Sequence, residues 1–137
     1  GLGAAGGGGL GYLSYKPENK NVNNAYEHNL LTENELKNIQ NNPNLWETHY
    51  KSLIKARQPI GNAYATGCLT KEQWEQGLKN PNLWKTKFLP EMETRNEIGS
   101  AYFWGYLNKP EWTEALNDTS LWKTKYKRLA EIRAKQQ

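Results

Sequence analysis

The sequence of 137 residues is poor in the side chains that bind metal ions or act as nucleophiles, with one cysteine, Cys68, and two histidines, His28 and His49. A single cysteine excludes an internal disulfide, and so few thiol and imidazole groups leave no ligand cluster for zinc. The glycine run at residues 6–9 neither follows a strand pattern nor opens a helix pattern, which excludes a common type of phosphate-binding loop. We therefore expect a protein that is not an enzyme and that uses no cofactor and no metal.

The sequence also lacks any apolar run close to the roughly 20 residues that a membrane-spanning helix needs. Its net charge of +4 is mildly basic, and the cations gather near the C-terminal end. This basic patch has two interpretations: it binds nucleic acid or another anionic surface, or it is the solvated face of a helix whose negative dipole end attracts cations. The patch consists of Lys123, Lys125, Lys127, Arg128, Arg133 and Lys135.

What the sequence does contain is a motif written three times, as NNAYEHNLLTENEL from residue 23, GNAYATGCLTKEQW from residue 61 and GSAYFWGYLNKPEW from residue 99. Ala25, Ala63 and Ala101 are separated by steps of 38 residues, and the step holds without a gap to the end of the sequence. Units of roughly 20 to 50 residues that recur in this way bury their apolar faces by stacking on one another. We therefore expect three repeats, stacked as a short solenoid or bundle: repeat 1 (about residues 23–60), repeat 2 (61–98) and repeat 3 (99–137).

Each repeat encodes two helices, so the predicted fold class is all-α. Thr32, Thr70 and Asn108 each precede a Glu or Gln by three residues, which is the pattern of a capping box at a helix N-terminus. In repeats 1 and 2 this first helix ends before Pro43 and Pro81, because proline disfavours helix in the residue before it. A second, longer helix follows, with its cap at one of two positions in each repeat: Asn44, Asn82 and Ser120, or the Asn or Asp two residues earlier.

The longer helix contains Pro59 in repeat 1 and Pro90 in repeat 2, which do not occupy equivalent positions. Because proline removes a backbone hydrogen bond within a helix, we expect a kink or a break that is placed differently in each repeat. Two pairs of glycines recur as well: Gly61 with Gly99, where we expect close backbone packing, and Gly67 with Gly105, at an expected helix C-terminus.

The patterns IGNAY..G.LT..QW..GL at residues 60–78 and IGSAYFWGYL..PEW..AL at residues 98–116 resemble the helical hairpins of tetratricopeptide and Sel1-like repeats. In that class, a glycine and an alanine–aromatic pair on one helix precede a polar turn and a second helix. The resemblance implies an α-helical scaffold that binds peptides or proteins, and it identifies no ligand.

Residues 1–22 are predicted as a separate arm and linker. Residues 1–11 hold seven of the twelve glycines, which have no side chains with which to order themselves, and residues 19–24 are predicted as a polar linker. Because the sequence has no initiating Met, we expect N-terminal processing and an organellar location, in a plastid or a mitochondrion. We expect the arm to extend into a partner protein and become ordered there, with Gly1, Leu2, Gly3, Leu10, Tyr12, Leu13 and Tyr15 as contact residues.

The aromatic residues divide into two groups. One tryptophan, Trp104, aligns with His28 of repeat 1 and Thr66 of repeat 2 and so breaks the repeat. Together with Phe103 and Tyr106, it is the candidate exposed anchor, since aromatic side chains dominate the energetics of many protein interfaces. The other tryptophans recur at repeat positions and are predicted to be core residues: Trp46, Trp74, Trp84, Trp112 and Trp122.

One arginine recurs in each repeat, as Arg57, Arg95 and Arg133. Lined up along a stack, the three could contact phosphates or carboxylates of a partner. Alternatively, each arginine pairs with an acid on a neighbouring helix and lies against an aromatic ring. The residue types alone allow both interpretations.

These features favour a non-catalytic linker or accessory subunit that binds other protein subunits in a larger assembly. We further expect a peripheral place in an organellar membrane complex, photosynthetic or respiratory, because the sequence carries no spanning segment of its own. The alternative is an RNA-binding helical-repeat protein that uses the arginines and the basic patch, and its affinity would fall steeply with salt.

Overall fold

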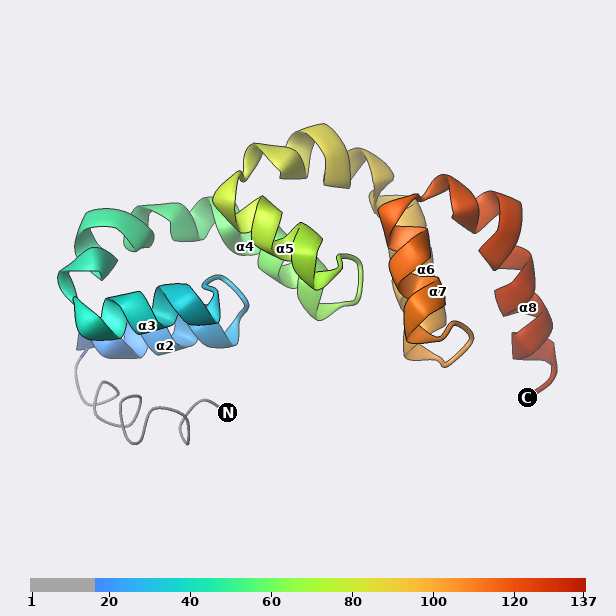
Figure 1. Ribbon diagram of the computed structural model, residues 1–137, viewed down its shortest axis with the longest axis horizontal. Coiled ribbons are helices and arrows are strands. Elements are labelled where there is room, and N and C mark those ends of the chain that lie inside the picture. The colour runs from blue at the N-terminus through green and yellow to red at the C-terminus, as the bar shows by residue number, and fades with distance from the viewer. Residues whose placement is uncertain (1–16) are drawn as a thin grey trace. The chain divides into compact units, whose positions relative to one another are not determined.

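The computed structural model describes residues 17–137, with side chains from Lys20 onward, and this part of the chain contains helices and no strands (Figure 1). The predicted all-α class is therefore confirmed. The predicted arm contacts lie outside the described residues: Gly1, Leu2, Gly3, Leu10, Tyr12, Leu13 and Tyr15.

The chain divides into two compact units, Gly1–Gly61 and Asn62–Gln137. The described elements of the first unit are α2 (Pro17–Glu27), α3 (Glu33–Asn41), the π-helical turn η2 (Trp46–Tyr50) and the 3-10 turn η3 (Lys51–Leu53). Helix α4 (Ile54–Ala65) begins in the first unit and ends in the second. The second unit continues with α5 (Lys71–Lys79), η4 (Trp84–Phe88), η5 (Leu89–Glu91), α6 (Met92–Phe103), α7 (Lys109–Asn117), η6 (Trp122–Tyr126) and α8 (Lys127–Lys135).

The short helices α3, α5 and α7 begin where the capping boxes predict. The Thr32 hydroxyl accepts a hydrogen bond from the Glu35 N–H, and the Glu35 carboxylate accepts one from the Thr32 N–H at 2.9 Å. Thr70 with Gln73 and Asn108 with Glu111 form the same reciprocal pairs. These bonds satisfy backbone donors that a helix N-terminus otherwise leaves unpaired, so the start of each short helix is encoded locally.

The helix before each capping box ends in a Schellman motif, in which two N–H groups beyond the helix bind carbonyls of its last turn. In repeat 2 the N–H of Cys68 donates to the Ala63 carbonyl at 2.9 Å, and the N–H of Gly67 donates to the Tyr64 carbonyl at 3.2 Å. The corresponding bonds are present in the other two repeats. We call these segments the first turn (residues 28–30), the second turn (66–68) and the third turn (104–106). Their central residues have positive φ angles: 64° at Asn29, 80° at Gly67 and 81° at Gly105.

A π-helical turn interrupts the long helix at the same position of every repeat, so the prediction that prolines would kink or break the long helices at different places was wrong. A π-helical turn lies at residues 46–50, 84–88 and 122–126, in steps of 38 residues, although repeat 3 has no proline in this region. Pro90 lies in the 3-10 turn that follows the π turn of repeat 2, and α4 continues through Pro59. The position of the irregularity therefore belongs to the repeat, and the prolines add to it locally.

Helix α2 corrects the prediction of a polar linker at residues 19–24, because it spans Pro17–Glu27. Val22 and Ala25, three residues apart on one face of α2, are both buried in the core of the first unit. Two buried apolar residues with this spacing are enough to hold an otherwise polar helix on a core. The asparagines beside them hid this short apolar face in the sequence.

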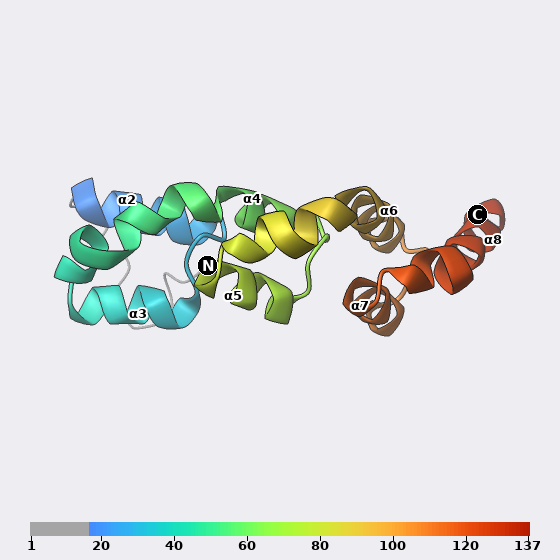
Figure 2. The same cartoon turned by 90° about the horizontal axis from the view of Figure 1, so that it is seen from above.

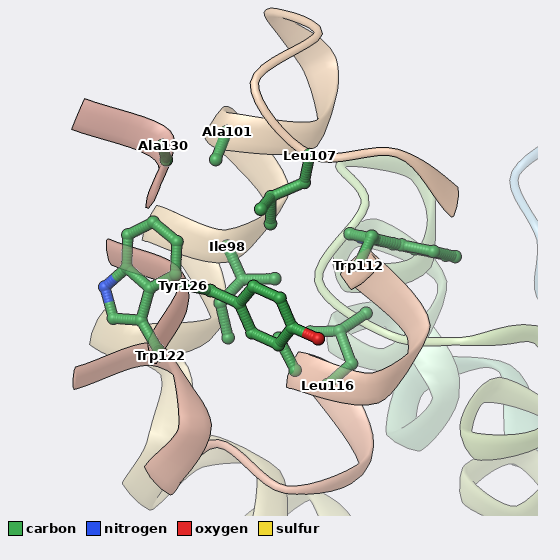
Figure 3. Close-up of a cluster of buried hydrophobic side chains, with 9 residues drawn as sticks. Ile98, Ala101, Leu107, Trp112, Leu116, Trp122, Tyr126 and Ala130 are labelled. Carbon is green, nitrogen blue, oxygen red and sulfur yellow. The ribbon is translucent and has the colours of Figure 1, made fainter. Parts of the chain in front are cut away.

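Each unit has its own apolar core. In the first unit, residues from α2, α3 and η2 form one cluster that includes Leu36, Ile39 and Trp46. In the second unit, α6 and α7 lie side by side (Figures 1 and 2), and Figure 3 shows residues of α6, α7, η6 and α8 packed around Ile98 and Leu116. The core prediction holds for four repeat tryptophans, whereas Trp84 is only half-buried: the four buried ones are Trp46, Trp74, Trp112 and Trp122.

Candidate functional site

The largest exposed apolar side chains of the described residues meet at the C-terminal end of α6. Phe103 is 79 % exposed and Trp104 is 63 % exposed. Their rings contact edge to face, with centroids 5.4 Å apart. The Trp104 backbone N–H donates to the Ser100 carbonyl at 3.0 Å, so the helix geometry extends to this residue and positions both rings. Two adjacent exposed aromatic rings on an ordered turn are typical of a protein interaction site.

The third predicted anchor residue, Tyr106, has a different environment. Its side chain is half-buried and packs against the apolar core of the second unit. Tyr106 therefore forms the base of the site, while Phe103 and Trp104 stand out from it.

A groove of about 420 Å³ extends from Trp104 between α6 and α8. It is apolar at its base and has charged residues, Lys127 and Glu131 among them, around it. Alanines supply the space for the groove, and Figure 3 shows two of them, Ala101 and Ala130, near the Trp122 indole. The apolar lining comes from Ala101, Trp104, Tyr106, Trp122, Ala130 and Ala134.

In repeat 2 the positions equivalent to Tyr106 and Ala134 carry polar groups that bond to each other. These residues are Cys68, which is buried, and Asn96, whose Oδ1 accepts a hydrogen bond from the Cys68 thiol at 3.1 Å. The Thr66 hydroxyl lies 3.3 Å from the same sulfur. Side-chain hydrogen bonds thus occupy in repeat 2 the position that remains an open groove in repeat 3.

A second groove, of about 750 Å³, lies on the other side of the exposed pair. Phe103 lines it together with Tyr102 and Trp112, whose rings stack with centroids 4.5 Å apart. Phe103 and Trp104 therefore separate two grooves, and a ligand in either groove would contact one of the two rings.

The three repeated arginines bind acceptors within their own units. Arg57 forms a bidentate pair with the Glu35 carboxylate, with both N···O distances 2.9 Å, and also donates to the Leu30 carbonyl at 2.8 Å. Arg133 repeats this arrangement with the Glu111 carboxylate and the Tyr106 carbonyl, at 2.7 Å and 2.9 Å for Nη1. Charge-assisted bidentate bonds of this kind fix an arginine in place. Binding of a partner's anion by these arginines stays a prediction.

Arg95 occupies the same position in repeat 2 but binds different partners. Gln73 stands where repeats 1 and 3 have glutamate, and its amide oxygen accepts from Arg95 Nη1 at 3.1 Å. The balancing carboxylate comes from Glu91, one turn earlier on the chain, at 2.8 Å. Arg95 is 1 % exposed and its guanidinium lies 4.9 Å from the centre of the Phe88 ring. Burial lowers the pKa of the Arg95 guanidinium below its ordinary value, whereas the hydrogen bond to Glu91 opposes that shift.

The tryptophans of the π turns differ in how their indole N–H is satisfied. Trp122 Nε1 donates to the Glu97 carboxylate at 2.8 Å. Asn21 occupies the equivalent place in repeat 1, and Trp46 Nε1 is buried with no hydrogen-bond partner among residues 17–137. An unpaired buried N–H of this kind costs about 1–3 kcal/mol.

The basic patch is exposed along η6 and α8. Lys125 lies 3.7 Å from the Glu114 carboxylate and over the Tyr126 ring. Its pKa is raised chiefly by its contact with Tyr126 and also by Glu114. The exposed cations of the patch are Lys123, Lys125, Lys127, Arg128 and Lys135.

Within residues 17–137, no three His, Cys, Asp or Glu side chains are close enough to hold a metal ion together. The same part of the chain includes no helix with the length and hydrophobicity that crossing a membrane requires. Comparison of the chain with protein-family models, with curated proteins and with solved structures finds no match.

Sequence reasoning identified the exposed aromatic pair and, as one of two alternatives, the pairing of the arginines with acids, but it did not identify which acids. Glu35 and Glu111 precede Arg57 and Arg133 by 22 residues each. Opposite charges that keep one separation in two repeats are a usable signal for an ion pair. Sequence reasoning also missed the contrast between the second and third turns, because that contrast depends on what covers each turn.

Proposed function

We propose that the chain is a non-catalytic, protein-binding helical-repeat subunit that attaches to its partner through the third turn. One observation carries the proposal: a helix glycine packs on the turn in repeats 1 and 2, whereas the third turn has no such cover among residues 17–137, and Phe103 and Trp104 stand exposed at its start. The equivalent residues are Glu27 and His28 in repeat 1, and Ala65 and Thr66 in repeat 2.

The amino-acid types at this position support a binding role. Large apolar side chains that are exposed next to each other commonly mark an interaction site. Repeat 3 presents two such aromatic rings beside an apolar groove. Burying two such rings in a partner removes a large apolar area from water, which is the main source of affinity in many interfaces.

The proposal can be tested by isolating the full chain from its native source under mild conditions. We expect the wild-type chain to migrate within a larger assembly and the Phe103→Ser/Trp104→Ser variant to migrate alone with an unchanged melting temperature. Leu89→Ser is the matched control, because Leu89 is another large apolar residue with 51 % exposure, and this variant should still assemble. Normal assembly of the double variant would refute the proposal.

The finer expectation, a peripheral subunit of a photosynthetic or respiratory membrane complex, stays a prediction. The same isolation tests it, because the assembly would then sediment with organellar membranes and dissociate from them without loss of the protein-protein contacts.

The second candidate is an RNA-binding helical-repeat protein, supported by the exposed cations of η6 and α8. Because the three repeated arginines bind acceptors within the chain, the lysines would carry this activity. The test is binding of single-stranded homopolymeric RNA at increasing salt. If the lysines contact phosphates, affinity falls steeply with salt, and Lys123→Gln/Lys127→Gln weakens it further without loss of stability.

A further inference from the structure

The second turn shows what covers a turn of this kind. A Cβ added at Gly99 of α6 would lie 2.9 Å from the Thr66 carbonyl oxygen and 3.0 Å from the Gly67 carbonyl oxygen. No side chain fits there, so only glycine allows the helix to approach the turn. Trp112 of α7 completes the cover by donating its indole N–H to the Gly67 carbonyl at 2.7 Å. The cover therefore consists of a helix glycine and an indole donor.

The first turn is covered by the same kind of residue. A Cβ added at Gly61 would lie 2.7 Å from the His28 carbonyl oxygen and 3.0 Å from that of Asn29. These two carbonyls are the equivalents of those that Gly99 contacts in repeat 2. In both turns, although their side chains differ, a Cβ at the covering glycine would lie within 2.7–3.0 Å of the two turn carbonyls. The backbone of the turn, and not its side chains, therefore requires a glycine in the covering helix.

The third turn has the same backbone conformation and no cover among residues 17–137. The N–H of Tyr106 donates to the Ala101 carbonyl at 2.8 Å, and Gly105 has a φ of 81°. A Cβ added at Gly105 would meet nothing within 4 Å, whereas one added at Gly67 would lie 3.6 Å from the Gly99 Cα. Gly105 is exposed and Gly67 is half-buried. The carbonyl groups that bind the cover in repeat 2 are therefore available in repeat 3.

We propose that the third turn binds a helical hairpin of a partner protein that places a glycine on the Trp104 and Gly105 carbonyls and an indole N–H on the Gly105 carbonyl. This inference rests on the proposed function and specifies the chemistry of its partner. Phe103 and Trp104 add contacts beside the hairpin, since their equivalents Ala65 and Thr66 remain exposed even where the turn is covered.

A second molecule of the chain does not fit this description. Its repeat 1 has Asn23 at the position of Gly61 and Gly99, and Leu36 at the position of Trp74 and Trp112. If Asn23 approached the third turn as Gly99 approaches the second turn, the Asn23 Cβ would lie 2.9–3.0 Å from two carbonyl oxygens of the turn, which is too close for a side chain. Leu36 has no N–H to donate. The partner hairpin therefore differs in sequence from repeat 1 of this chain.

These two mismatches give the test. The Asn23→Gly/Leu36→Trp double variant of the full chain carries the glycine and the indole that the proposal requires. We expect it to bind immobilised wild-type chain at least about tenfold more tightly than wild-type chain in solution does, because it removes a steric clash and adds a hydrogen bond. At high concentration the double variant should also associate with itself, giving a mass that rises with concentration.

Two matched probes separate the contributions of the two residues. Asn23→Ala/Leu36→Trp restores a Cβ and should lose the gain in affinity. Asn23→Gly/Leu36→Phe keeps an aromatic ring without the N–H and should bind about five- to tenfold more weakly than the double variant. Circular dichroism of each probe verifies folding. If the double variant is unfolded, Asn23→Gly alone, which leaves α3 unchanged, serves as the probe and should bind more tightly than the wild type.

Three outcomes would overturn the inference: a folded double variant that binds no more tightly than the wild type, equal binding by the alanine probe, or tight association of the wild-type chain with itself. None of these is the outcome that refutes the proposed function, which is assembly of Phe103→Ser/Trp104→Ser with its native partner. A failed probe experiment together with loss of native assembly in that variant would mean that the turn binds a protein by another geometry.

Discussion

The second and third turns have the same backbone and different surroundings. In both, an arginine below the turn donates to a turn carbonyl: Arg95 to Cys68 at 3.1 Å and Arg133 to Tyr106 at 2.9 Å. The Arg95 side chain is 1 % exposed and that of Arg133 is 35 % exposed. The local sequence therefore sets the conformation of the turn, while its burial depends on the helices that neighbouring residues supply.

The difference extends to how the arginine charge is balanced. Arg133 binds the carboxylate of Glu111, next to the uncovered turn. Below the covered turn, Gln73 is neutral, and its side-chain amide donates to the Leu116 carbonyl at 2.9 Å, while Glu91 balances Arg95 from a more exposed position. An amide that can both donate and accept thus joins α5 to a carbonyl at the end of α7, which a carboxylate could not do.

The largest effect should come from removing the arginine below the covered turn. We expect Arg95→Ala to lower the free energy of unfolding by about 3–5 kcal/mol, because it leaves the Cys68 carbonyl without its buried donor and the Glu91 carboxylate without its ion-pair partner. Arg133→Ala, at the uncovered turn, should cost much less, because solvent screens the exposed ion pair. Urea unfolding of both variants measures the difference. Equal losses would mean that burial of the turn contributes little.

The next effect should come from the contact between α6 and the second turn. Gly99→Ala should destabilise the chain by about 1–3 kcal/mol, because the added methyl group would press on two backbone carbonyls that cannot move aside. Ser100→Ala, at the exposed neighbouring residue, serves as the control and should be nearly neutral. Thermal unfolding followed by circular dichroism compares the two, and a neutral Gly99→Ala would contradict the role given to that glycine.

Removing the indole donor should have a smaller effect. Trp112→Phe keeps a ring that can stack on Tyr102 but leaves the Gly67 carbonyl without its 2.7 Å hydrogen bond. We expect a loss of about 1 kcal/mol, measured by urea unfolding. Trp104→Phe changes an exposed indole of the uncovered turn, and it should leave stability unchanged. A loss of the same size in both variants would show that the hydrogen bond is not the cause.

The smallest effect should be on the loss of stability at low pH. Hydrogen bonds from Arg133 lower the pKa of the Glu111 carboxyl below its ordinary value of 4.5, although burial opposes this shift. Because the pKa of Glu111 is lower in the folded chain than in the unfolded chain, its ion pair stabilises the fold at pH values above the unfolded pKa. This contribution is lost as the pH falls through the folded pKa. Between about pH 5 and pH 3 the wild type should therefore lose more stability than Glu111→Gln. Glu72→Gln, at an exposed position of α5, is the control and should follow the wild type.

The sequence predicted what short-range chemistry determines. The three capping boxes and the turn glycines act within a few residues, so Thr70 and Gly67 could be placed from their neighbours alone. Gly99 was also predicted, because a glycine that recurs in mid-helix indicates close packing. The exposure of Trp104 followed from its failure to recur in the other repeats.

The features that were missed depend on contacts between distant residues. The π turns recur at one position of the repeat, and the helical spacing of the apolar residues around them gave no sign of a change in helix type. Pro59 and Pro90 were expected to cause the irregularity of the long helices, but the π turn also occurs in repeat 3, which has no proline there. The uncovered third turn could not be inferred from the sequence because its conformation is the same as that of the covered turns.

The buried thiol of Cys68 offers a way to observe the covered turn without changing the protein. Cys68 is the sole cysteine, and its sulfur is held between Asn96 and Thr66. A thiol-reactive dye can label it only during moments when the second turn separates from its surroundings. When closing is faster than labelling, the labelling rate reports the free energy of that local opening. The labelling rate of Cys68 in the unmodified chain therefore measures how stably α6 packs on the second turn.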